Sequence, residues 1–274
     1  MLRSFYSLAT MVLLALCTSC ASKAFYYEYH HEPTPEEEAR IGSRWRAPKP
    51  EPQSIYTIRR IDPEHKPRLF MEPSWEAKAW DHAELGFLSH AWPASKYKGA
   101  RVFFKMLHDD EHIYAIFYGY DRYMRAVYFR PQTLACRDNA VEFFFAPAGL
   151  PGGYCNIEVS VSGAYLAQFH PDCQVVWRNA SPLRSPIETC SSINCIVANE
   201  VKDNVEWCIA FIINAKDVLW EMGLDDSKPL SGQTWQANIY HCAEDSSHKR
   251  WFSWAPLQAL NFHRPQDFQP IQFE

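Results

Sequence analysis

Two glutamates, Glu142 and Glu158, are the side chains whose types and spacing best suit chemistry, because each lies in a segment typical of a β-strand. Glu142 belongs to the apolar run 141–145, and Glu158 belongs to the alternating segment 154–162. On neighbouring strands the two carboxylates would face each other. Facing carboxylates about 5 to 9 Å apart can act as the acid and base of glycoside hydrolysis. We favour a simpler interpretation, in which one of them holds an arginine or a bound polar ligand.

A loop near the C-terminus gathers aromatic, histidine and arginine side chains. Phe262, His263 and Arg264 lie there, after the aromatic segment 251–256 and before a last apolar segment that ends at Phe273. Loops that border strands often carry binding residues. We therefore expect a terminal strand, preceded by a loop that supplies part of a binding site.

Short strands separated by turn residues make up most of the chain after residue 54. The patterns predict strands over 55–61, 102–107, 112–121, 141–145, 154–162, 164–169, 205–213, 235–242 and 249–254. A short helix is expected from Asn214 to Met222, ending at Gly223, and another short helix or turn at 75–79. Many strands and few helices predict an all-β fold, an antiparallel β-sandwich with short helices.

The N-terminal 53 residues carry targeting and spacing signals. Residues 1–20 combine Arg3, an apolar run and Ser19-Cys20, which predicts a lipoprotein-type signal peptide with lipidation of Cys20; simple secretion is the alternative. Residues 21–53 are rich in proline and glutamate and are predicted to be a tether. We thus expect one domain over 54–274 in an exported, membrane-anchored lipoprotein of the cell envelope, at the outer membrane or in the periplasm.

Composition narrows the partners. The net charge of −5 argues against nucleic acid and anionic membrane surfaces, so membrane contact is expected through the lipid anchor only. We expect a monomer. Beyond the signal peptide seven cysteines remain, an odd number without zinc-type spacing, and Cys190 and Cys195 could bridge a hairpin.

Catalytic and cofactor motifs are absent from the sequence. No nucleophile elbow, P-loop or His-Glu-x-x-His segment occurs. We interpret the acidic residues as solvated turns, although structural calcium stays open for Asp109, Asp110, Glu111, Asp225 and Asp226. Haem has candidate ligands but no CxxCH attachment site; the candidates are Met106, Met124, His112, His241 and His263.

Three blocks of residues share their order and spacing with one known family. The first is the predicted hairpin 102–125, with Tyr120-Asp121 before Arg125. The second reads Asp138-Asn-Ala-Val-Glu142-Phe-Phe-Phe, then Pro147, Gly153-Tyr154, Glu158 and Gly163. The third combines 235–240, Ser253-Trp254-Ala-Pro256 and Phe262-His263-Arg264-Pro265. Together they resemble the family-nine carbohydrate-binding module-like proteins of bacteria, over about residues 70–274.

This resemblance implies a β-sandwich that binds sugars on an aromatic-lined patch. It carries over Glu142, and approximately Glu158, as polar residues of the site. Chemically, these carboxylates would accept hydroxyl hydrogens, and we expect Arg125 and Arg264 to donate. Two tryptophans sandwich a terminal sugar in the characterised modules, but the matching positions here hold Ala135 or Cys136, and Phe262 or His263. Trp254 is expected to supply an aromatic face instead, with Trp251, Tyr123 and Tyr128 as alternatives.

The function predicted from the sequence is non-catalytic carbohydrate binding that supports glycan capture or breakdown by other enzymes, without a cofactor. Two alternatives stay open. One is a glycoside hydrolase that uses Glu142 and Glu158; the other is a haem-binding electron-transfer domain on the same scaffold.

Overall fold

A computed structural model describes residues 51–67, 73–172, 181–183 and 185–274. The predicted signal peptide with Cys20, and the predicted tether up to residue 50, lie outside the described residues.

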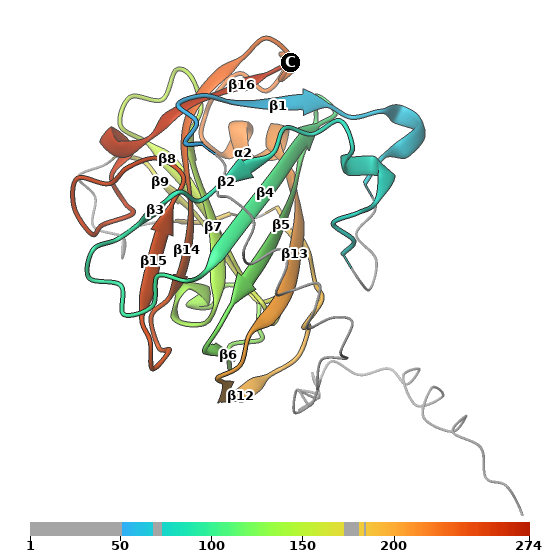
Figure 1. Cartoon of the computed structure of the whole chain (residues 1–274). Helices are drawn as coiled ribbons and strands as arrows, with labels where there is room; N and C mark the ends of the chain where they lie inside the picture. The colour runs from blue at the N-terminus through green and yellow to red at the C-terminus, as the bar shows by residue number, and fades with distance from the viewer. Residues whose placement is uncertain (1–50, 68–72, 173–180, 184) are drawn as a thin grey trace, which may run out of the picture.

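Strands dominate the described residues (Figure 1). They are β1 (Tyr56–Arg60), β2 (Gly86–Phe87), β3 (His90–Ala91), β4 (Arg101–His108), β5 (His112–Asp121), β6 (Met124–Ala126), β7 (Ala140–Ala146), β8 (Tyr154–Ser160), β9 (Tyr165–His170), β10 (Ser181–Pro182), β11 (Glu188–Ser191), β12 (Val197–Val201), β13 (Val205–Asn214), β14 (Thr234–Ala243), β15 (Arg250–Ser253) and β16 (Gln269–Phe273). The helical elements are α2 (Ala215–Glu221) and the 3-10 turns η1 (Pro63–His65), η2 (Lys78–Trp80), η3 (Ala135–Arg137) and η5 (Pro265–Asp267).

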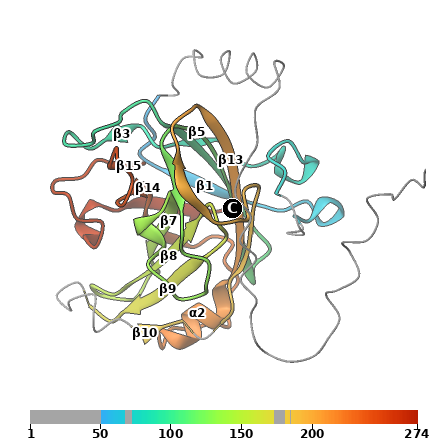
Figure 2. The same ribbon diagram turned by 90° about the horizontal axis from the view of Figure 1, so that it is seen from below.

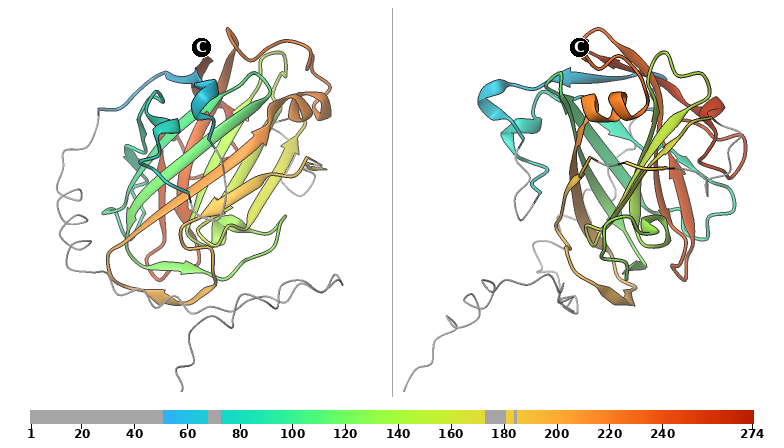
Figure 3. Two further views of the ribbon diagram at one scale, coloured as in Figure 1. Left: turned by 90° about the vertical axis from the view of Figure 1, so that its right-hand side faces the viewer. Right: turned by 180° about the vertical axis from the view of Figure 1, so that it is seen from behind.

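Two antiparallel sheets pack face to face (Figure 3). One has the order β10-β9-β8-β7-β14-β16, with β15 and β3 beside β14, and the other has the order β4-β5-β13-β11. Strand β1 joins them, because it pairs in parallel with β16 through Tyr56–Ile58 and with β4 through Arg59 and Arg60. The structure confirms the predicted β-sandwich and its terminal strand.

The core lies between the sheets and follows the period-two pattern of the strands. On β7, Val141, Phe143 and Phe145 are fully buried in it, so the residues between them point to the outer face. Helix α2 closes one end of the core (Figure 2), and the side chain of Asn214 accepts a hydrogen bond from the Asp217 N–H as its N-cap. The predicted helix is confirmed.

Pairing across long distances produced several elements that the patterns did not predict. Residues 86–91 form two short strands, β2 and β3, because β4 and β15 offer them edges. The disulfide that Cys190 and Cys195 could have formed with each other is not present. Strand β11 pairs with β13, whereas β12 pairs with β6, so the hairpin that would have brought the two cysteines together does not form.

Among the described residues, no helix is long and apolar enough to cross a membrane.

Candidate functional site

A cavity of about 270 Å³ lies on the outer face of the sheet that contains β7, β8 and β14. Its walls come from these strands, from the segment around η3 and from the loop before η5. The lining consists of Cys136, Glu142, Glu158, Glu244, Trp251, Leu260, Asn261, Phe262 and His263. The cavity therefore joins carboxylates with aromatic rings from distant parts of the sequence.

Glu142 and Glu158 are directly opposite each other on β7 and β8, as the sequence predicts. Both are almost fully buried, although they line the cavity. Glu142 Oε1 accepts a hydrogen bond from the Cys242 thiol at 2.9 Å. Glu158 Oε1 accepts from Asn156 Nδ2 at 2.9 Å, and its Oε2 accepts from the Cys136 N–H at 3.3 Å. Among the described residues neither glutamate has an ion pair with a basic side chain, so the arginine-holding interpretation is wrong for both.

Burial of this pair favours the protonated form of both carboxyls. Desolvation raises the pKa of Glu142 well above its ordinary value, and the charge of Glu158 adds to this rise. Desolvation also raises the pKa of Glu158, to about 7, against the hydrogen bonds from Asn156 and Cys136. The pair therefore holds at least one proton near neutral pH, and it can both donate and accept hydrogen bonds.

Aromatic side chains form the other walls. The Phe262 ring stacks flat on the Tyr240 ring, with centroids 4.0 Å apart and an interplanar angle of 5°. His263 Nδ1 lies 2.8 Å from the hydroxyl of Tyr154. Trp251 is half-buried, and its indole N–H points at Glu244 Oε1 at 3.5 Å. Phe262 and Trp251 are thus held by contacts that leave parts of both rings in the cavity lining.

Buried polar side chains on the same face of the sheet support Glu158 from the side. His170 Nε2 lies 2.8 Å from Asn156 Oδ1, and the amide nitrogen of Asn156 donates to Glu158. Desolvation lowers the pKa of His170 to about 4, so this imidazole is neutral at neutral pH. Since an amide oxygen only accepts, the His170 Nε2 carries the proton, which fixes the orientation of Asn156.

Trp254 does not belong to the site, contrary to the prediction. Its ring is fully buried in the core, in edge contacts with Tyr56 and Phe104. Phe252 and Trp254 share the inward face around β15, so Trp251 takes the outward face. Of the predicted alternatives, Trp251 lines the cavity, whereas Tyr123 stacks on His248 elsewhere.

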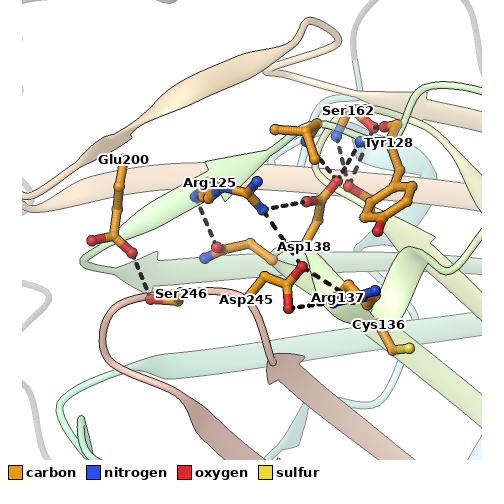
Figure 4. A network of polar contacts seen from close by, with 12 residues as sticks. Arg125, Tyr128, Cys136, Arg137, Asp138, Ser162, Glu200, Asp245 and Ser246 are labelled. Atoms are coloured by element: carbon orange, nitrogen blue, oxygen red, sulfur yellow. Dashed lines mark hydrogen bonds and ion pairs between the residues drawn. The ribbon is translucent and has the colours of Figure 1, made fainter.

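Arg125 and Arg264 also fall outside the cavity lining, contrary to their predicted role as ligand donors. The Arg125 guanidinium lies 3.6 Å from Asp138 and 3.9 Å from Asp245 (Figure 4). Arg264 Nε pairs with Asp267 at 3.1 Å, which anchors the loop at η5. Both arginines hold segments that border the cavity. Arg264, for example, directly follows Phe262 and His263, which line the cavity.

The proposed metal and haem ligands have other roles in the fold. Among the described residues, no group of three or more His, Cys, Asp or Glu is placed to hold a metal ion. Asp109 is bound by Lys66 and Tyr114. Met106 and Met124 are fully buried in the apolar core, and His241 lies 3.1 Å from buried Asp121, so these three are wrong as haem ligands.

Cys136, Glu244, Leu260 and Asn261 line the cavity but were not predicted to bind the ligand, although the resemblance placed Cys136 at or beside a tryptophan position of the family. A signal existed for Glu244, which shares the alternation of Tyr240 and Cys242 at the end of β14. The other three lie in turns and loops, where no periodicity indicates the direction of a side chain.

Comparisons with known proteins bear on this site. The profile of carbohydrate-binding family 9 matches residues 78–273. No curated protein sequence matches the chain.

Solved structures share the fold. A candidate carbohydrate-binding protein from Bacteroides uniformis ATCC 8492 is 22% identical, with a TM-score of 0.68 over 81% of this chain and 99% of that one. A family 9 carbohydrate-binding module from Caldicellulosiruptor kristjanssonii, in complex with cellotriose, is 13% identical, with a TM-score of 0.54 over 80% and 93% of the two chains. Its complex with glucose is 12% identical, with a TM-score of 0.55 over 80% and 95%.

The family profile spans strands β2 to β16 and includes every residue of the cavity lining. The chain belongs to carbohydrate-binding family 9.

Proposed function

We propose that this protein binds carbohydrate without transforming it, in the cavity between Glu142, Trp251 and Phe262. The observation that carries the proposal is the pairing of aromatic walls with two buried carboxyls in one small cavity. Sugars present apolar C–H faces and hydroxyl groups together. Aromatic rings match the first, and a partly protonated carboxyl pair, which donates and accepts, matches the second.

Cavity size and the structural relatives suggest the ligand. About 270 Å³ is below the range of about 300–1,000 Å³ that is typical of drug-sized ligand sites. This favours one or two sugar rings, such as a chain end, over a long glycan laid across a surface. Because structural relatives hold cellotriose and glucose, these are the first ligands to test.

We propose, from the N-terminal sequence, that this binding takes place at a membrane surface. Lipidation of Cys20 would anchor the chain, and residues 21–53 would space the sandwich from the anchor, so that captured glycan lies close to separate degrading enzymes. Metabolic labelling with a fatty acid tests this directly: the wild type takes up label and Cys20→Ser does not. Label uptake by the Cys20→Ser variant would contradict the anchor.

Calorimetric titration of the purified protein with cellotriose and glucose tests the binding. Trp251→Ala and Phe262→Ala are expected to weaken binding about ten-fold or more, because each removes a stacking surface. Trp220→Ala is the matched control, since Trp220 is 62% exposed on α2, outside the cavity lining. Failure to bind any sugar, or equal affinity in all three variants, would overturn the proposal.

The hydrolase alternative is favoured by one observation, the pKa of about 7 of Glu158, which suits a general acid. It is tested in the same samples by measuring the release of reducing sugar over time. Turnover that Glu142→Gln abolishes would establish an enzyme, whereas binding with unchanged ligand supports the binding role.

A further inference from the structure

The cavity carries acidic side chains without a cation to balance them. Glu142, Glu158 and Glu244 line it, and its lining contains no lysine or arginine. The remaining basic group is His263, but desolvation lowers its pKa to about 4, so it is neutral near neutral pH. An anionic ligand would therefore find no cation in the lining, whereas a cationic ligand could displace the proton that the Glu142–Glu158 pair holds and meet opposite charge.

One carboxylate oxygen in the wall has no partner. Glu142 is 2% exposed, and the Cys242 thiol reaches only its Oε1. Among the described residues no donor bonds its Oε2. Glu158 differs, because donors from Asn156 and Cys136 reach both of its oxygens. Glu142 Oε2 is not among the buried polar atoms of the described residues that lack a partner, so it is open to the cavity that Glu142 lines. Glu142 Oε2 is therefore the acceptor that a ligand in this cavity can satisfy.

We propose that the cavity selects an amino sugar. The protonated amine of the sugar lies against Glu142 and the opposing Glu158, and the sugar ring lies against Trp251 and Phe262. This inference rests on the proposed function and names the class of sugar. An ammonium group carries three donors and a positive charge, so it matches the free oxygen of Glu142 and balances the acidic wall.

The charge of the sugar substituent is expected to determine how tightly each ligand binds. A neutral sugar offers hydroxyl donors but leaves the carboxyls to compete for a proton. A protonated amine replaces that proton and forms charge-assisted hydrogen bonds, which are about twice as strong as neutral ones. It can also lie over the face of an aromatic ring. An N-acetyl group removes the positive charge, and a uronic acid adds a negative one, so both are expected to bind more weakly than the amine.

Three trisaccharides with the same β-1,4 glucan backbone isolate this effect. Cellotriose carries a hydroxyl at each C2, the fully deacetylated chitosan trimer carries an amine, and chitotriose carries an acetamide. Titrations of the purified protein at about pH 7 and low salt are expected to give at least about ten-fold tighter binding of the amine trimer than of the other two. Added salt is expected to reduce this preference.

Charge-removing variants locate the preference. Glu142→Gln is expected to bring the affinities for the amine trimer and cellotriose within about two-fold of each other. Glu244→Gln removes a charge from an exposed position at the rim of the cavity, without touching the core. It is expected to lower the preference for the amine trimer about two-fold or more. The test therefore stays decisive even if Glu142→Gln folds poorly. Glu188→Gln, on the exposed edge strand β11, is the matched control and should behave as wild type.

The outcomes separate this inference from the proposed function. Binding of cellotriose that equals or exceeds that of the amine trimer would overturn the inference and leave carbohydrate binding standing. An amine preference that survives both Glu142→Gln and Glu244→Gln would also overturn it. Failure of all three trisaccharides to bind would instead overturn the proposed function.

Discussion

Two buried acidic centres in the same sandwich differ in how their charge is balanced. Asp121 on β5 lies in the interior, where Arg250 Nη2 is 2.6 Å away and the amide of Asn139 donates at 3.0 Å. The Glu142–Glu158 pair lies at the cavity, and among the described residues it has no ion pair with a basic side chain. The first centre has its counter-charge within the fold, whereas the carboxyls of the second have no such counter-charge among the described residues and line an open cavity.

The difference appears in the proton equilibria. Burial alone would raise the pKa of Asp121, but the charge of Arg250 and the contact with His241 outweigh it, so its pKa lies below the ordinary value. At Glu142 burial and the neighbouring carboxylate act in the same direction and raise the pKa. We infer that the balanced centre stabilises the fold and that the unbalanced centre binds the ligand.

The largest expected effect is on stability at the balanced centre. Asp121→Asn leaves the Arg250 guanidinium buried without its counter-charge, which costs about 3–5 kcal/mol in comparable buried pairs. Chemical denaturation at about pH 7 measures it. Glu142→Gln, the matched change at the other centre, is expected to cost less than about 1 kcal/mol or to stabilise, because it replaces a carboxyl whose pKa burial raises with a neutral amide of similar shape. Equal losses in the two variants would refute the division.

The next effect is a pH dependence of stability at the unbalanced centre. Burial raises the pKa of Glu158 from 4.5 to about 7, so the folded protein holds this proton more tightly than the unfolded chain. The stability it contributes is complete below the unfolded pKa and is lost as the pH rises through about 7. Between about pH 4.5 and pH 8 the wild type should lose about 3 kcal/mol relative to Glu158→Gln, which has no proton to lose. Parallel stability curves for the two proteins would contradict the raised pKa.

The smallest expected effect concerns the arginines near the cavity. Arg125→Lys and Arg264→Lys are expected to change sugar affinity less than about two-fold, because their partners Asp138 and Asp267 hold the guanidinium groups outside the lining. Titration with cellotriose measures the change. A ten-fold loss in either variant would mean that the arginine reaches the ligand and that the binding site extends beyond the cavity lining.

Local pattern predicted the carboxylate pair but not its surroundings. Alternation along 154–162 places Glu158 on the face opposite Ile157 and Val159, and one strand pairing brings Glu142 to it. The Asp121 centre could not be predicted in this way. Its partner Arg250 lies 129 residues along the chain, and only the packing of β5 against β14 and β15 brings them together.

The tryptophans show where residue type alone misleads. Trp251 and Trp254 are three residues apart, so in extended chain they point to opposite faces, and only one of them can line a surface site. Which one does so depends on the register of β15, where Trp251 pairs with Cys242, a cavity-side residue. The sequence therefore predicted that a tryptophan in this segment contributes to the binding site. The register of β15 determines that this tryptophan is Trp251.

A crystal structure of the protein with a bound trisaccharide, cellotriose or its amine analogue, tests the central claim most directly. We expect a sugar ring between Trp251 and Phe262, with a hydroxyl or amine within hydrogen-bond distance of Glu142 Oε2. A sugar bound elsewhere, with the Glu142–Glu158 cavity open and unchanged, would contradict it.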